Sequence, residues 1–200
     1  MGKKGFTLIE IITVIIIIGI ILTIAVPAVS SYILKSRKTN YSGTISAYVE
    51  TIKGEYDMGE FGDYIDDSEL MIVPIKIIKL EKGESDSSPF GKYDFDKSYV
   101  LIKSNTYTND YYVTFVDSAD YGVSNVKFDN VSSETIDKVN SREITDITSY
   151  FSCNGKEYEL NNNIFTYDGK NYIACDYRIY KDENSACYNS LPVLVMCEQW

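Results

Sequence analysis

The chain has 200 residues and a formal net charge of −10 at pH 7, a size that accommodates one or two domains. The charge is unevenly distributed, because residues 1–38 carry a net +4 and residues 39–200 a net −14. Such an acidic surface repels phosphates, so no direct nucleic-acid binding is predicted. The sequence has no histidine, which excludes histidine-based triads and zinc sites. We therefore predict no catalytic residues, no cofactor and no enzyme activity.

A long apolar segment lies near the N-terminus. Residues 11–29 include no charged side chain, and about 20 apolar residues in a helix span the hydrocarbon core of a bilayer. A cleaved secretory signal is one alternative, but its apolar region is shorter. A buried core helix is another, but a helix that is apolar on every face does not suit so small a chain. The segment is therefore predicted to cross a membrane once, in contact with lipid.

Glu10 places a carboxylate at the start of this apolar segment. An ionised side chain near the bilayer centre costs about 2.5–3.5 kcal/mol, and less near the interface. One interpretation is that Glu10 lies at headgroup depth, where the positive end of the helix dipole stabilises it. The other is that it pairs with a positive charge from another chain. Basic residues flank the segment on both sides, so their count does not determine its orientation.

The first ten residues, MGKKGFTLIE, resemble the leader and N-terminus of type IV prepilins and pseudopilins. The resemblance implies that residues 1–5 are a leader, that a prepilin peptidase cleaves after Gly5, and that Phe6 is then N-methylated. Glu10 matches the glutamate that stands fifth in the mature chain of this family. The resemblance further implies that the leader stays cytoplasmic and that the C-terminal domain is exported. The chain would thus be a single-pass protein of the inner (cytoplasmic) membrane, and after processing part of a cell-surface filament.

Cleavage before Phe6 would free an α-amino group that is protonated near neutral pH. Among packed apolar helices, this cation from one subunit can meet the Glu10 carboxylate of a neighbour. Either charge left unpaired there would cost several kcal/mol, so the pair would fix the axial register of the subunits. Phe6 and Glu10 are therefore the predicted assembly residues.

Gly19 and Pro27 are the predicted kink positions of this helix. Proline removes a backbone donor and clashes with the carbonyl four residues earlier, which predicts a kink or a locally melted turn. The alternative is a proline that the membrane helix tolerates. In pilins, glycine and proline often stand at these positions, and the resemblance implies a segment that can extend on assembly.

Beyond the membrane segment the apolar residues keep a helical spacing, which predicts an amphipathic continuation of the same helix to about residue 56. The stripe consists of Tyr41, Ile45, Tyr48, Val49, Ile52 and Tyr56. We therefore divide the chain into four parts. They are a leader (residues 1–5), a transmembrane and assembly helix (6–34), an amphipathic continuation of that helix (35–57) and an exported β-rich domain (58–200).

The exported domain shows β-branched and aromatic runs that predict strands at residues 71–73, 75–80, 98–102 and 111–116. The dipeptides at 154–155 (Asn-Gly) and 168–169 (Asp-Gly) predict hairpins. A short helix is predicted at 133–140, capped by Ser132 or Ser133. The fold class is α+β: a long helix on an antiparallel sheet, a roll that is similar to pilins. Residues 88–93 (SPFGKY) also resemble the proline–aromatic–glycine loop of pseudopilins.

Four cysteines lie in the last quarter of the chain, at 153, 175, 187 and 197. They form no CxxC pair, so no metal site is predicted. In an exported domain an even number indicates two disulfides, with three possible connectivities. Neighbouring hairpins favour Cys153–Cys175 together with Cys187–Cys197, and four free thiols are the alternative for a host without oxidative export. The acidic loops are interpreted as solvated surface, with calcium binding as the alternative.

These observations predict a structural subunit of a type IV pilus-like or pseudopilus filament. The resemblance implies its partners: the prepilin peptidase, other pilin subunits, a membrane assembly platform with its ATPase, and membrane lipid. One alternative is a minor pilin, an adhesive module at a filament tip. The other is a single-pass membrane-anchored extracellular domain that never assembles. The sequence does not distinguish major, minor, competence and secretion subunits.

Overall fold

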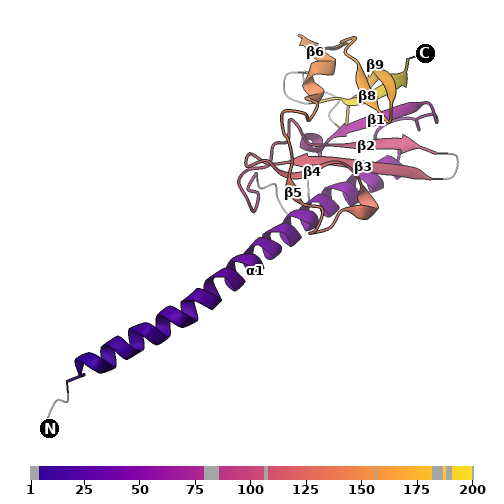
Figure 1. The fold of residues 1–200 in the computed structure, drawn as a ribbon. Helices are drawn as coiled ribbons and strands as arrows, with labels where there is room; N and C mark the ends of the chain where they lie inside the picture. The colour runs from indigo at the N-terminus through magenta and orange to yellow at the C-terminus, as the bar shows by residue number, and fades with distance from the viewer. Residues whose placement is uncertain are drawn as a thin grey trace. The chain divides into compact units, whose positions relative to one another are not determined.

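The structure, a computed structural model, describes residues 5–78, 86–105, 108–155, 157–181, 187 and 191–199. Its first element is the helix α1 (Leu8–Asp57), which Figure 1 shows as one continuous coil. This helix confirms the single helix predicted over about residues 6–56. The chain divides into two compact units, Met1–Arg37 and Lys38–Trp200, and α1 contributes residues to both of them.

An eight-stranded antiparallel sheet forms the framework of the second unit (Figure 1). Its spatial order is β5-β4-β3-β2-β1-β10-β9-β8. The strands are β1 (Glu69–Pro74), β2 (Tyr99–Ser104), β3 (Asn109–Val116), β4 (Tyr121–Lys127), β5 (Asp137–Lys138), β8 (Phe165–Tyr167), β9 (Lys170–Arg178) and β10 (Val193–Glu198). The predicted strands at 71–73, 98–102 and 111–116 are confirmed as β1, β2 and β3. The C-terminal strand β10 lies between β1 and β9, so the end of the chain is held in the middle of the sheet.

The C-terminal half of α1 packs on one face of this sheet. All six residues of the predicted stripe are buried, and they pack against alternate residues of the strands, such as Val100 and Phe115. The rings of Tyr41 and Phe115 meet edge to face with centroids 5.7 Å apart. The Tyr41 hydroxyl also donates a hydrogen bond to the Tyr121 carbonyl oxygen at 2.9 Å. Burying each such side chain contributes about 1.5–3 kcal/mol, and the predicted α+β class is confirmed.

The opposite face of the sheet has a second apolar core, covered by the chain that follows β5. Ile144, Ile147 and Tyr150 are buried there, the last two in the 3₁₀ helix η3 (Ile147–Tyr150). Although β8 is the last strand of the sheet, the ring of its Tyr167 lies 5.6 Å from that of Tyr112 in β3. The β8–β9 hairpin therefore curls over this second face.

A buried carboxylate fixes the connection between β3 and β4. Asp117 is 2% exposed, and its Oδ1 accepts hydrogen bonds from the backbone N–H groups of Ala119 (2.9 Å) and Tyr121 (3.0 Å). Its Oδ2 accepts a hydrogen bond from the Ser88 hydroxyl at 2.5 Å. The neighbouring Phe90 ring stacks on Tyr121 with centroids 4.0 Å apart. The proline–aromatic–glycine loop at 88–93 is thus attached to the β3–β4 turn.

Both predicted hairpins are confirmed. The turn at 154–155 joins β6 (Phe151–Asn154) to β7 (Glu157–Leu160), a separate two-stranded sheet, and the turn at 168–169 joins β8 to β9. Gly155 and Gly169 both have positive φ, which glycine adopts without the strain of a side chain. The dipeptides therefore specify these turns for the expected physical reason.

Two local predictions are wrong. Residues 75–80 were expected to form a strand. Instead, Pro74 ends β1 and the chain continues into the 3₁₀ helix η1 (Ile75–Ile77), in which Ile75 is buried; Ile78, just after it, is buried as well. Residues 79–80 lie outside the described residues. Residues 133–140 were expected to form a helix. They form a turn followed by β5, which pairs with the first two residues of β4 at the sheet edge.

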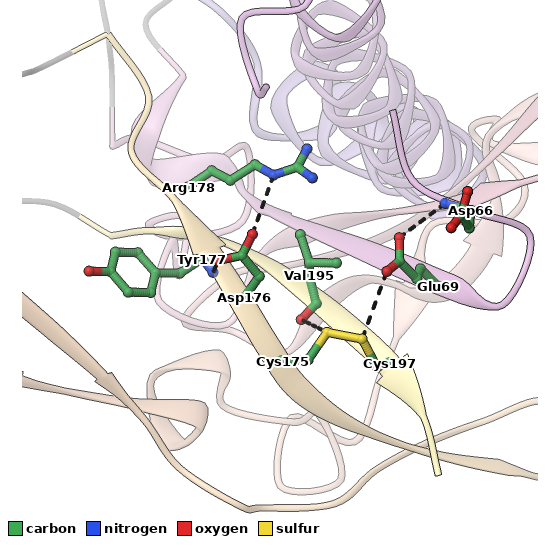
Figure 2. Close-up of a disulfide and its surroundings, with 8 residues drawn as sticks. All are labelled: Asp66, Glu69, Cys175, Asp176, Tyr177, Arg178, Val195 and Cys197. Atoms are coloured by element: carbon green, nitrogen blue, oxygen red, sulfur yellow. Dashed lines mark hydrogen bonds and ion pairs between the residues drawn. A yellow bond between two sulfur atoms is a disulfide. The ribbon is translucent and has the colours of Figure 1, made fainter. Parts of the chain in front are cut away.

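The four cysteines form two disulfides, Cys153–Cys187 and Cys175–Cys197, which corrects the preferred pairing of Cys153 with Cys175 and of Cys187 with Cys197. A β-bulge explains the second bond. Val195 pairs with Asp176 and Met196 with Ala174, so Cys175 is the extra residue of β9. From this position its sulfur reaches Cys197 on the adjacent strand, as Figure 2 shows.

Candidate assembly site

The start of α1 is closed by reciprocal hydrogen bonds between Thr7 and Glu10. The Glu10 backbone N–H donates to Thr7 Oγ1 at 3.3 Å, and Glu10 Oε2 accepts from the Thr7 backbone N–H at 2.7 Å and from the Thr7 hydroxyl at 2.8 Å. Thr7 precedes the first helical residue, Leu8, so the two residues occupy the N-cap and N3 positions of a capping box. The two side chains together thereby satisfy two N–H groups that the helix itself leaves unpaired, those of Thr7 and Glu10.

The two oxygens of the Glu10 carboxylate have different surroundings. Oε2 accepts both hydrogen bonds from Thr7. Oε1 accepts none from the part of the chain that the structure describes, and the Glu10 side chain is exposed. The capping box therefore holds the carboxylate in one orientation and leaves one oxygen available to a group from outside the chain.

Gly5 and Phe6, the predicted processing residues, lie just before this cap and outside the helix. The Phe6 side chain is 83% exposed. The structure brings Gly5, Phe6 and Glu10 together within one turn of the N-cap, while residues 1–4 of the predicted leader lie outside the described residues. The capping box itself was not predicted, although its signal, Thr-x-x-Glu before an apolar run, is present in the sequence.

The apolar part of α1 meets the length and composition required to cross a membrane. Four of its threonine and serine side chains donate to the carbonyl oxygen four residues earlier, which pairs these hydroxyl protons in apolar surroundings. The donors are Thr13, Thr23, Ser30 and Ser31, at 2.8, 2.8, 3.0 and 3.1 Å. The segment can therefore present its apolar side chains to lipid or to other helices with these four hydroxyl donors satisfied.

Gly19 and Pro27 lie inside α1, far along the helix from the capping box. The helical assignment is continuous from Leu8 to Asp57, so the locally melted turn that was one of the two expectations at Pro27 is absent. Proline in a membrane helix is tolerated where side chains or neighbours re-satisfy the backbone; the group that Pro27 frees is the Thr23 carbonyl oxygen, four residues earlier. A kink at Gly19 and Pro27 stays a prediction.

Comparison with known proteins gives matches to part of the chain. The family model described as the prokaryotic N-terminal methylation motif matches residues 1–26. A type IV major alpha-pilin of Moraxella bovis is 56% identical over 46 residues, which is 23% of this chain and 29% of that protein. Fimbrial protein Q of Moraxella bovis is 53% identical over 46 residues, with the same shares. The match thus spans less than a third of these relatives, and no solved structure matches the chain.

The chain thus combines a methylation motif at the start of an apolar N-terminal helix with an antiparallel α+β domain. Over part of its length the chain is thus similar to type IV pilins.

Proposed function

We propose that this chain is a structural subunit of a type IV pilus-like or pseudopilus filament, assembled through the N-terminal part of α1. The observation that carries the proposal is the Glu10 carboxylate, held by Thr7 through Oε2 and open at Oε1. A prepilin peptidase cleaves after Gly5, and the methylated amino group of Phe6 on one subunit then pairs with Oε1 of Glu10 on the next. Because the capping box fixes the carboxylate beforehand, little orientational freedom is lost when this pair forms.

The remaining organisation follows from this assignment. Residues 6–34 cross the cytoplasmic membrane, residues 35–57 continue the helix under the sheet, and residues 58–200 form the exported domain. The other partners are further pilin subunits, membrane lipid and a membrane assembly platform with its ATPase. The Moraxella bovis proteins that match 46 residues of this chain carry the names of a major pilin and a fimbrial protein, which supports a filament rather than an isolated membrane anchor.

Processing is tested by the N-terminal mass of the protein purified from the membrane and sheared-surface fractions of its own host. We expect a chain that begins at N-methylated Phe6. A chain that still begins at Met1 in both fractions would contradict the proposal, and a simple membrane anchor would then be the better assignment.

Assembly is tested by two substitutions that separate the charge of Glu10 from its cap. Glutamine also serves at the N3 position of a capping box, so Glu10→Gln keeps the cap and removes the charge, whereas Glu10→Val removes both. We expect both variants to be processed and membrane-inserted but to lose sheared-surface filaments, while Glu60→Gln, at an exposed position of the second unit, assembles normally. Normal filaments of Glu10→Gln would show that the charge is dispensable and would refute the pairing.

A further inference from the structure

A half-open cavity of about 140 Å³ lies on the sheet face opposite the C-terminal half of α1. Its floor is formed by strands β2, β3 and β4, and its walls by β8 and the loop that precedes η3. Cavities of about 150 Å³ hold a single six-membered ring. The space therefore fits one small molecule and not an extended chain.

Three tyrosine rings supply most of the aromatic lining, namely Tyr99, Tyr112 and Tyr167. Tyr112 and Tyr167 meet edge to face, with centroids 5.6 Å apart. Burial raises the pKa of Tyr99 and of Tyr167, so both hydroxyls keep their protons at neutral pH and remain neutral hydrogen-bonding groups. The cavity therefore combines flat apolar surfaces with neutral hydroxyl groups.

A β-bulge brings two polar side chains to the cavity. Val113 pairs with Val126 and Phe115 with Val123, so Ser124 and Asn125 together stand opposite Thr114. Asn125 has a φ of +51°, and its backbone N–H donates to Thr114 Oγ1 at 3.1 Å, which holds this conformation. Within the described residues, the side chains of Ser124 and Asn125 make no hydrogen bond, although both line the cavity. Asparagine adopts positive φ more readily than most residues, and the exposed Asn125 amide is available to a molecule in the cavity.

Glu143 adds a carboxylate at the cavity wall. Its Oε1 accepts a hydrogen bond from Asn140 Nδ2 at 2.6 Å, which orients the group and leaves Oε2 for a ligand. No lysine or arginine is among the described residues that line the cavity. An anionic ligand would therefore meet a negative charge without compensation, whereas a ligand with hydroxyl donors would gain a charge-assisted hydrogen bond.

We propose that this cavity binds one neutral pyranose ring, such as the terminal sugar of a glycan. The C–H faces of the ring pack on the tyrosines, and its hydroxyls donate to Glu143 and exchange hydrogen bonds with Asn125 and Ser124. The proposal is independent of filament assembly, because no residue of the cavity belongs to the N-terminal unit. For a ligand of about twelve non-hydrogen atoms we expect a dissociation constant of the order of 1 mM.

The test is saturation-transfer NMR on the full chain in lipid nanodiscs. The probes are methyl pyranosides of glucose, galactose, mannose and N-acetylglucosamine, with glucosamine and glucuronate as charged comparators. Glu143→Gln removes the charge and keeps the shape, and Asn125→Gly removes the amide while relieving the positive φ. The matched control is Glu159→Gln, because Glu159 also accepts from an asparagine amide, Asn154 Nδ2 at 2.8 Å, and does not line the cavity.

We expect at least one neutral pyranoside to show saturable binding. Each cavity variant should raise its dissociation constant about ten-fold, the effect of losing one strong hydrogen bond. Glu159→Gln should bind it as the unmodified chain does. If Glu143→Gln fails to fold, Asn125→Gly decides alone, since it relaxes the backbone. The proposal is overturned if no neutral pyranoside shows saturable binding, if only a charged comparator binds, or if the cavity variants bind with unchanged affinity.

Discussion

Gly122 lies against the backbone of Phe115 so closely that a Cβ on residue 122 would stand 1.9 Å from the Phe115 carbonyl oxygen. Gly122 pairs with Val116 of β3 on one side and with Asp137 of β5 on the other, so neither neighbour can withdraw without breaking the ladder. We expect Gly122→Ala to lower the free energy of unfolding by about 3 kcal/mol, at the upper end of overpacking effects. Urea unfolding followed by near-UV circular dichroism measures the loss.

A matched control for this substitution lies in α1. A Cβ on Gly43 meets nothing within 4 Å, and alanine is favoured over glycine inside a helix by about 1 kcal/mol. Gly43→Ala should therefore leave stability unchanged or raise it slightly. Equal losses at the two positions would mean that the β3–β4 contact is not the cause.

Stability should depend on pH mainly on the alkaline side. Burial raises the pKa of Tyr150 to about 12, and it also raises the pKa of Tyr93, Tyr99 and Tyr172. The folded chain holds these protons more tightly than the unfolded chain, so their contribution is fully present below about pH 10 and is lost as the pH rises through 12. Urea midpoints and tyrosinate absorbance should change together in that window. With no histidine in the chain, we expect a nearly flat profile from about pH 6 to 9; a step there would contradict this account.

Each disulfide should contribute separately to stability. The bonds join residues 34 and 22 positions apart, and cross-links of this span stabilise by about 2–4 kcal/mol, somewhat more for the longer loop. We expect the double variants Cys153→Ala/Cys187→Ala and Cys175→Ala/Cys197→Ala each to lose an amount in this range. Peptide mapping without reductant should recover the same two pairs from the unmodified protein. Recovery of Cys153 bound to Cys175 would refute this connectivity.

Asp117 should be the main anchor of the 88–93 loop. Asp117→Ala leaves the N–H groups of Ala119 and Tyr121 and the Ser88 hydroxyl without their acceptor, a loss of about 2–4 kcal/mol for a buried group of this kind. Ser88→Ala removes one of the three bonds and should cost about 1 kcal/mol. Hydrogen exchange should then rise at Ala119 and Tyr121 in Asp117→Ala but not in Ser88→Ala. Equal exchange in the two variants would show that the hydroxyl, not the backbone pair, holds the turn.

The sequence predicts well those parts of the fold that local pattern determines. The spacing from Tyr41 to Tyr56 predicts the buried face of α1, and the two turn dipeptides predict their hairpins, because periodicity and positive φ are properties of a few neighbouring residues. The run at 75–80 misleads because Pro74 ends the strand, a constraint that outweighs the alternating pattern. The position of β10 between β1 and β9 depends on contacts across most of the chain, which no local pattern records.

The same distinction applies to the sites. The capping box of Thr7 and Glu10 has a local signal in the sequence, Thr-x-x-Glu before an apolar run, because both residues lie within one turn of the helix. The disulfide partner of Cys175 was not readable, because it depends on a bulge that changes which residues of β9 and β10 stand side by side. The cavity is likewise made by the folding of β8 over β3, which joins residues such as Tyr112 and Tyr167 from distant parts of the chain.

The order of the four cysteines has a consequence for resistance to proteolysis. Each disulfide begins or ends inside the loop of the other, since Cys175 lies between 153 and 187, and Cys187 between 175 and 197. A protease that cuts any one peptide bond from residue 153 to 197 therefore releases no fragment, because at least one sulfur–sulfur bond spans the cut. With bonds between consecutive cysteines, one cut between 175 and 187 would have detached the rest of the chain, including the central strand β10.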